Sequence, residues 1–289
     1  MSANAMPPAR QLGSAIEPVT AHVYFSPECH ANYHALGFAQ SSGEFNGVAA
    51  PDGPAYFTSR GSVMGQVAPE LVAAAFAVFS PAAVVPAVTF GWSITDATTI
   101  CTARDDGAMG QMRRLLGERP AGVDRANSIL RRAVSVLRPE GRPLYAGLLS
   151  LGIPDDPLFA VWRAGDMLRE FRGDGHIAAL VCEGLSGLEA LITHAGAGDV
   201  TAKVLASSRA WPEQEWNEGV DGLASRGIVN ADGSLTEKGR AQRDRIELRT
   251  DELSIAPYSV LGDEKCERVR ELARPLSKAI VDSGMIGFR

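Results

Sequence analysis

The pattern of apolar and polar residues predicts a mainly α-helical chain. Apolar residues recur at the three- and four-residue spacing of helices through most of the sequence before residue 196. No two segments before residue 200 show the alternation of paired strands, so we expect no sheet there. Residues 41–56 are rich in Ser, Gly, Pro and Asn and are predicted to form a loop. The predicted helices span 27–37, 69–79, 96–116, 122–138, 143–151, 156–172, 174–183 and 185–195.

The last third of the chain has a different order of elements. Helices are predicted at 201–207 and 213–226, after a linker-like break at 196–199. Asn230 to Gly233 form the turn signal of a β-hairpin, and Thr236 begins a further helix. Three helices, a small β-hairpin and another helix are the order of a winged helix-turn-helix.

These patterns divide the chain into three parts. We predict an N-terminal multi-helix domain over 1–185, a winged-helix domain over 186–260 and a C-terminal helix within 261–289. That last helix has Val269, Leu272, Leu276 and Ile280 at helical spacing. Its apolar stripe fits either a dimer interface or packing on its own chain.

The segment LREFRGDGH, residues 168–176, is the most unusual stretch of the N-terminal part. Gly173 is predicted to end one helix, and Asp174 to cap the next. Arg169 and Arg172 continue the helix face on which Trp162 lies. One interpretation is a tight corner between two helices, held by salt bridges. The other is a pocket for an anionic or polar ligand, lined by Arg169, Arg172 and His176.

A more specific site hypothesis follows from the chemistry of these side chains. Arg169 and Arg172 would hold an anionic or carbonyl-bearing ligand, with Arg60 as a further ligand-binding candidate. Trp162 would supply a stacking wall. The remaining candidates, for catalysis, are His176 as the acid–base group and Asp174 as the carboxylate that orients it.

The sequence points to no particular reaction. The GxSxG, GxGxxG and P-loop patterns are absent, and the identity of any cofactor is left open. His30 and His34 are one helical turn apart, a spacing that can bind zinc, but no glutamate follows His30 as in metalloprotease helices. We therefore predict no metal site, and leave open whether the protein is an enzyme.

Composition and charge are those of an ordinary globular protein. The 289 residues are 45% hydrophobic, and the net charge of −6 gives no general attraction to nucleic acid or anionic membranes. The four cysteines are scattered without a CxxC pair, and the first ten residues contain no apolar leader. We expect reduced thiols and a cytoplasmic protein. The uncharged run between Glu70 and Asp96 contains prolines and is predicted to form buried helices with a break, not a membrane span.

Several motifs resemble known families. The segment LASRGIVNADGSLTEKGR, residues 223–240, is similar to the second-helix-and-wing segment of MarR-type winged-helix proteins. A longer set of motifs resembles a family of actinobacterial helix-turn-helix proteins whose function is not established. This resemblance implies LREHRGDGH in the central run, where this chain has Phe171 in place of the histidine. The motifs are YFTSR (56–60), GRPL (141–144), LREFRGDGH (168–176), WPEQEW (211–216), LTEKGR (235–240) and ELRTD (247–251).

The resemblance to MarR-type proteins implies a transcription regulator, but the charges argue against it. The candidate recognition helix carries Glu213, Glu215, Glu218 and Asp221 against a single base, Arg226. DNA contacts depend on Lys and Arg, and the wing NADGS contains neither. Arg240, Arg243 and Arg245 follow the wing and leave phosphate contacts open as an alternative.

Two functions are therefore predicted as alternatives. The first is a small-molecule-binding protein, with a biosynthetic enzyme as one form of it, whose winged helix has lost DNA binding. The second is a ligand-responsive MarR-like regulator that binds DNA. Pairing of terminal helices in MarR-type dimers implies a homodimer. We expect a small-molecule partner and neither DNA nor a membrane.

Overall fold

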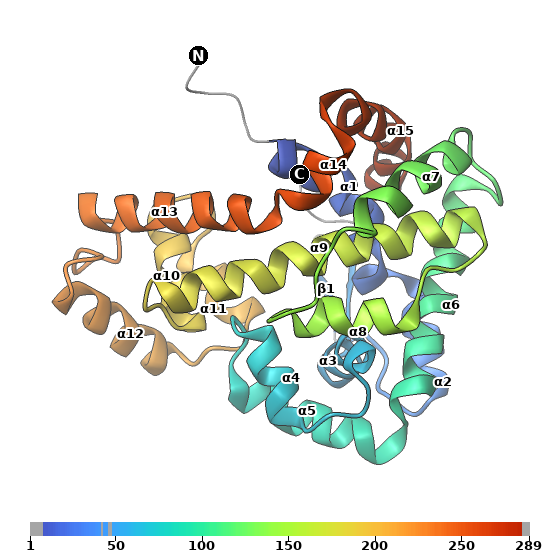
Figure 1. Cartoon of the computed structure of the whole chain (residues 1–289). Coiled ribbons are helices and arrows are strands. Elements are labelled where there is room, and N and C mark those ends of the chain that lie inside the picture. Colours follow the sequence, from blue (N-terminus) through green and yellow to red (C-terminus); the bar gives the residue numbers. More distant parts are fainter. Residues whose placement is uncertain (1–7, 42, 46–47, 285–289) are drawn as a thin grey trace.

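The computed structural model describes residues 8–41, 43–45 and 48–284, and within them the chain is mainly helical (Figure 1). The first seven residues, where we expected no leader, lie outside this range. The elements before residue 120 are α1 (Pro8–Ala21), η1 (His22–Phe25), α2 (Pro27–Ala35), β1 (Gly43–Phe45), β2 (Val48–Ala50), α3 (Gly53–Gly61), η2 (Ser62–Met64), α4 (Pro69–Phe76), α5 (Pro81–Ile94) and α6 (Ala97–Leu116). The later elements are α7 (Val123–Val134), α8 (Pro143–Leu151), α9 (Pro157–Cys182), α10 (Gly187–Ala197), α11 (Ala202–Ser208), α12 (Glu213–Ser225), α13 (Glu237–Ser254), α14 (Ala256–Leu261) and α15 (Asp263–Asp282).

The long helix α9 crosses the molecule and packs against α1, α7, α8 and α13 (Figure 1). It begins where the sequence predicts, with Asp156 accepting a hydrogen bond from the Phe159 backbone N–H at 2.8 Å. The predicted break at Gly173 is wrong, because the helix continues through it to Cys182. A glycine inside a helix costs about 1 kcal/mol relative to alanine. Here Gly175 makes room for the Arg142 side chain, since an added Cβ would lie 2.7 Å from Arg142 Nη1 and the end of that side chain would have to shift.

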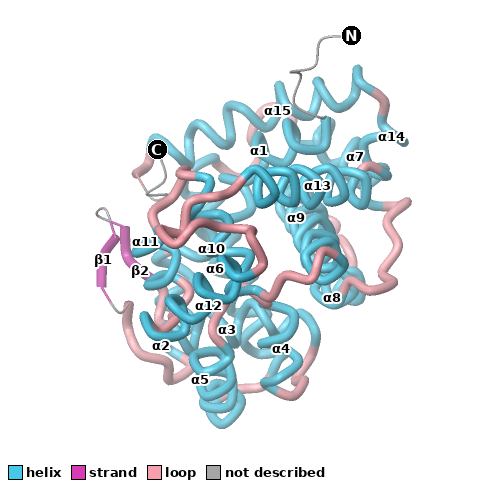
Figure 2. Tube along the Cα trace, turned by 90° about the vertical axis from the view of Figure 1, so that its left-hand side faces the viewer, coloured by secondary structure: helices cyan, strands magenta, loops and turns pink. Residues whose placement is uncertain are grey.

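The prediction that no strands precede residue 200 is also wrong. β1 and β2 form an antiparallel hairpin at the periphery of the molecule, with Glu44 opposite Ala49 (Figure 2). The predicted loop ends at Asp52, which accepts a hydrogen bond from the Ala55 N–H at 3.1 Å and caps α3. A short strand pair with Gly at its edge has too few residues for the alternation that identifies strands in a sequence.

Two hydrophobic clusters make up the core of the described residues. The larger cluster combines side chains between Ile16 and Phe171 with those of α14 and α15. The smaller cluster runs from Ala179 to Ile246 and includes Trp216 and Leu223. Helix α9 contributes to both clusters and therefore joins them.

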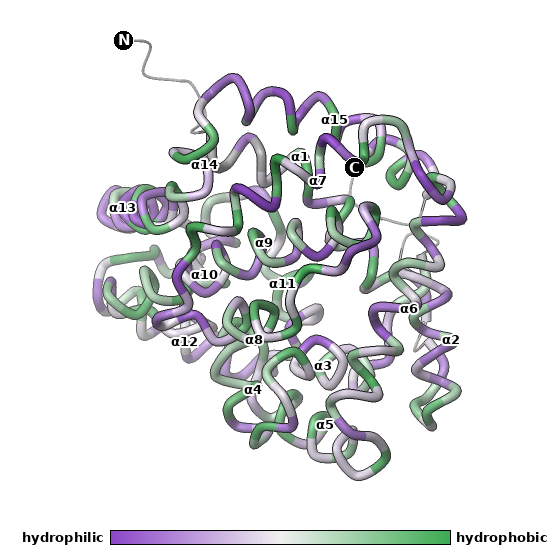
Figure 3. Tube along the Cα trace, turned by 45° about the vertical axis from the view of Figure 1, so that its right-hand side comes forward, coloured by the Kyte–Doolittle hydropathy of each residue, from purple (hydrophilic) through white to green (hydrophobic). Residues whose placement is uncertain are grey.

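The helix order predicted for the last third is present. α10, α11 and α12 are followed by α13, and the chain between the last two forms a turn. The predicted hairpin is reduced to an isolated antiparallel bridge between Val229 and Leu235. Helix α13 is mainly hydrophilic along its length and runs beside the C-terminal half of α9 (Figures 1 and 3).

The apolar stripe of α15 is covered within its own chain. Helix α15 packs on α1 and α7, and Val269, Leu276 and Ile280 are buried there. Ser277 also donates a hydrogen bond to the Ala15 carbonyl at 2.6 Å. A homodimer, which stays a prediction, would have to use another surface.

The predicted helices with a break between Glu70 and Asp96 are present as α4 and α5, but α5 is buried only at Val84, Val88 and Gly91 and leaves Phe90 exposed. No single helix of the described residues is long and apolar enough to cross a membrane. Only α9 and α10 taken together have the length and apolar composition of a span, and the chain bends by 95° at the break between these two helices. All four cysteines are unpaired.

Candidate functional site

Most charged candidates from the central segment are engaged in ion pairs within the protein. Glu170 accepts hydrogen bonds from Arg60 Nη2 at 3.1 Å and from Arg169 Nη1 at 2.8 Å. Burial acts to raise the pKa of Glu170, but the two guanidinium groups outweigh it and lower that pKa. Arg169 also pairs with Glu17 at 3.1 Å. Arg60 and Arg169 therefore hold α3, α9 and α1 together.

The next turn of α9 is connected to α13. Arg172 Nη1 lies 3.0 Å from Asp251 Oδ1, and His176 Nδ1 lies 2.9 Å from Thr250 Oγ1. Because the Thr250 hydroxyl donates to the Ile246 carbonyl at 2.7 Å, it accepts from His176, whose Nδ1 carries the hydrogen. Burial lowers the pKa of His176, so its neutral form is favoured.

Trp162 belongs to the core. Its side chain is fully buried, and the Arg104 guanidinium carbon lies 4.9 Å from its ring centroid. The six candidates Arg60, Trp162, Arg169, Arg172, Asp174 and His176 therefore do not surround one pocket. The physical reason is the continuity of α9: Trp162 and His176 share a face of the helix but lie about 21 Å apart along its axis, and Asp174 lies on another side.

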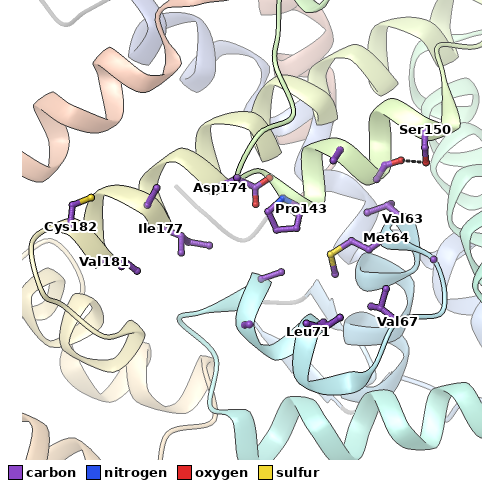
Figure 4. Close-up of a pocket in the computed structure, with 17 residues that line it drawn as sticks. Val63, Met64, Val67, Leu71, Pro143, Ser150, Asp174, Ile177, Val181 and Cys182 are labelled. Carbon is purple, nitrogen blue, oxygen red and sulfur yellow. Dashed lines mark hydrogen bonds between the residues drawn. The ribbon is translucent and has the colours of Figure 1, made fainter.

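A large cavity lies between η2 and α4 on one side and α8 and α9 on the other (Figure 4). Its volume is about 870 Å³, and its walls are almost wholly apolar. Two hydrophobic side chains at this site face solvent, since Leu71 is 58% exposed and Val181 is 68% exposed. The lining residues drawn and labelled in Figure 4 are Val63, Met64, Val67, Leu71, Pro143, Ser150, Asp174, Ile177, Val181 and Cys182.

Asp174 is the charged member of this lining. It comes from the middle of α9, and its carboxyl group lies beside Pro143 (Figure 4). Oδ2 accepts a hydrogen bond from the Tyr145 N–H at 3.0 Å, whereas Oδ1 is buried and has no hydrogen-bond donor among the described residues. Burial raises the pKa of Asp174 to about 6, against the opposing effect of the Tyr145 N–H. A buried carboxyl oxygen without a donor is a position where a ligand could donate a hydrogen bond.

His176 lines a different and smaller cavity. This space of about 260 Å³ lies between α9, α10 and α13, and His194, Arg243 and Glu247 also line it. The pKa of His194 is lowered, first by burial and then by Arg243. The two predicted catalytic residues, His176 and Asp174, thus belong to separate cavities.

The two histidines at zinc-binding spacing are each directed to a backbone carbonyl. His30 Nε2 lies 3.0 Å from the Tyr24 oxygen, and His34 Nδ1 lies 2.9 Å from the Phe38 oxygen. Within residues 8–41, 43–45 and 48–284, no three or more His, Cys, Asp or Glu side chains are grouped so that they could hold a metal ion.

Sequence reasoning missed the role of Arg142. Its guanidinium carbon stacks 3.6 Å from the Phe171 ring centroid, and it donates to the Phe171 and Leu253 carbonyls, the latter at 2.8 Å. Tyr145 meets the same ring edge-on, with centroids 5.2 Å apart. Phe171, where the family resemblance implies a histidine, is therefore packed between these two side chains. The available signal was the GRPL motif of the family resemblance, which contains Arg142; its Gly141 and Pro143 line the cavity.

Comparison with known proteins gives one match. A family model described as a helix-turn-helix family matches residues 9–287. No curated protein and no solved structure matches the chain. The matched range includes both cavities and every helix from α2 to α15, so the whole arrangement described above lies within it. The chain therefore belongs to this helix-turn-helix family.

Proposed function

We propose that this protein binds a largely apolar small molecule in the cavity between α4, α8 and α9. The observation that carries the proposal is the cavity itself, about 870 Å³ in volume and lined mainly by aliphatic side chains. Sites for small molecules are typically apolar hollows of about 300–1,000 Å³ with a few polar groups that fix orientation. Asp174 is such a group, and exposed Leu71 and Val181 would be covered by a bound ligand.

The proposal is tested with Nile red, a neutral apolar fluorophore that brightens in an apolar site. Ala178 is exposed on α9 and lines the cavity, so Ala178→Trp fills space there without disturbing the core. Ala241 is exposed on α13 and does not line the cavity, so Ala241→Trp is the matched control. We expect wild type and Ala241→Trp to bind Nile red with the same affinity. Ala178→Trp should bind about tenfold more weakly or not at all, because the indole occupies the site.

Equal binding by both variants would contradict the proposal. Near-ultraviolet circular dichroism of each variant establishes that the fold is retained, so that a loss of binding reports on the cavity alone.

The second candidate is a DNA-binding regulator, and the family match favours it at a coarse level. We infer that α10 to α13 form a winged helix, with α12 in the position of a recognition helix. The order of the helices and the Val229–Leu235 bridge support this inference. The charges of α12 do not favour DNA, because Glu213, Glu215, Glu218 and Asp221 are all exposed and would approach phosphates.

The basic residues around α12 are mostly engaged within the protein. Arg226 pairs with Glu189 at 2.6 Å, and Arg245 pairs with Glu183 at 2.9 Å. Lys238 donates to the Arg226 carbonyl at 2.8 Å. We therefore propose that this winged helix does not bind DNA. A duplex titration at about 50 mM and about 200 mM salt tests this proposal, since phosphate contacts produce a steep loss of affinity with salt.

A further inference from the structure

The cavity lining carries negative charge only. Asp174 is the one acidic group among the described residues that line it, and the same lining contains no Lys, Arg or His. The remaining polar side chains of the lining are those of Ser150 and Cys182, and the Ser150 hydroxyl donates to the Gly147 carbonyl at 2.7 Å. A ligand that enters this space therefore meets a single carboxyl group in apolar surroundings.

The charged groups that face Asp174 from its neighbours do not form an ion pair with it. Arg142 donates instead to two backbone carbonyls and stacks on Phe171. Arg60 forms its ion pair with Glu170. Arg142 and Arg60 act on Asp174 only at longer range, and Glu170 opposes them. The Tyr145 N–H occupies Oδ2 alone, so the hydrogen-bonding capacity of Oδ1 is left for a group from outside the chain.

We propose that the ligand is an apolar primary amine, whose ammonium group donates a hydrogen bond to Asp174 while its hydrocarbon part occupies the cavity. This inference rests on the proposed function and names the class of ligand. An ammonium group satisfies the Oδ1 lone pair and also balances the buried charge, and such charge-assisted hydrogen bonds are stronger than neutral ones. A hydroxyl group would satisfy only the lone pair, and a carboxylate would be repelled by Asp174.

The test is displacement of Nile red by three molecules with the same eight-carbon chain: octylamine, octanol and octanoate. The chain length is constant, so differences among them report on the polar end. At pH 7.5 we expect octylamine to displace the dye from wild type at a concentration about tenfold lower than octanol. Octanoate should be the weakest of the three. In Asp174→Asn, which keeps the size of the side chain, octylamine and octanol should become equal within about threefold.

The possible failures are distinguishable. If all three molecules displace Nile red from wild type equally, the amine inference is overturned while cavity binding stands. A preference for octylamine that persists in Asp174→Asn also overturns the inference, because the cation would be held elsewhere. If Ala178→Trp leaves Nile red binding unchanged, the proposed function fails and the inference fails with it. Even where Asp174→Asn does not fold, equal displacement of Nile red from wild type by the three molecules still overturns the inference.

Discussion

The backbone N–H of Tyr145 donates a 3.0 Å hydrogen bond to Asp174 Oδ2, so a residue from the middle of α9 caps the start of α8. The first N–H groups of a helix have no partner within the helix, and Arg142 at the N-cap of α8 supplies no side-chain acceptor. The carboxyl group also lies where the helix dipole favours negative charge. One residue therefore fixes the α8–α9 junction and provides the polar group of the cavity.

We expect the stability of the protein to depend on the protonation of Asp174. Its pKa is about 6 in the folded protein and near 3.8 when it is unperturbed, so the fold favours the neutral acid. The stabilisation that this group contributes at low pH is lost progressively as the pH rises from about 4 to about 6. Asp174→Asn carries no charge, so its stability relative to wild type should increase by roughly 1 kcal/mol between pH 5 and pH 7.5.

Urea unfolding of wild type and Asp174→Asn at the two pH values measures this difference. Other titrating groups are common to both proteins and cancel. Asp244→Asn, which removes an exposed carboxylate from α13, is the control and should follow wild type at both values. If the free energies of unfolding of wild type and Asp174→Asn differed by the same amount at both pH values, the buried carboxyl group would not titrate in this range.

A second expected effect concerns the ion pair at the centre of the larger core. Arg104 Nη2 lies 2.7 Å from Asp166 Oδ2, and both side chains are 2% exposed. Arg104→Met would remove the ion-pair partner of buried Asp166 and should lower the free energy of unfolding by about 3–5 kcal/mol. The double variant Arg104→Met/Asp166→Leu removes both charges and should be more stable than Arg104→Met alone.

The exposed pair Arg119–Asp124 is the comparison, since its side chains are 69% and 59% exposed. Arg119→Ala should leave the urea midpoint nearly unchanged, because solvent screens this pair. If Arg104→Met were equally harmless, the central ion pair would not be needed for the fold.

The structure separates His176 from the proposed ligand site. His176 lines the smaller cavity and bonds to Thr250, so His176→Ala should leave Nile red affinity within about twofold of wild type. Fluorescence titration of the folded variant measures this. A large loss of binding would return the site to the group of residues that the sequence predicted around His176.

The acidic face of α12 can be altered to test its role. We expect wild type to show no duplex binding at about 50 mM salt, because exposed carboxylates repel phosphates. Glu218→Lys/Asp221→Lys reverses two charges on that face and should produce measurable, salt-sensitive binding. Electrophoretic mobility shift assays compare the two proteins. Tight, sequence-selective binding by wild type would show that other residues contact DNA.

The sequence predicts most helices of this fold but not the junction in α9. Side chains cap the N-termini of α9, α10 and α13, namely those of Asp156, Ser186 and Thr236. Helices α9 and α13 begin where their cap residues predict. Gly173 and Asp174 also form a local stop-and-start signal, yet the helix passes through them. Packing of α7, α8 and α13 on α9 overrides that preference, and such contacts between distant segments are not visible in the local pattern.

The candidate site was predicted only in part for a related reason. Asp174 is among the predicted residues, but as the carboxylate that would orient His176 and not as part of an apolar cavity. Its partners in the cavity, such as Val63, Leu71 and Ala146, are ordinary aliphatic residues from three separate segments. Nothing in their local sequence distinguishes them from core residues, so only the folded chain shows that they enclose a space.

The location of the ligand is tested most directly at Cys182. This cysteine lines the cavity and is exposed, whereas Cys29, Cys101 and Cys266 are buried. We expect Ellman's reagent to modify Cys182 first in the native protein, and saturating Nile red to slow that reaction about fivefold or more by covering the thiol. An unchanged rate with the dye bound would place the binding site elsewhere and contradict the proposed function.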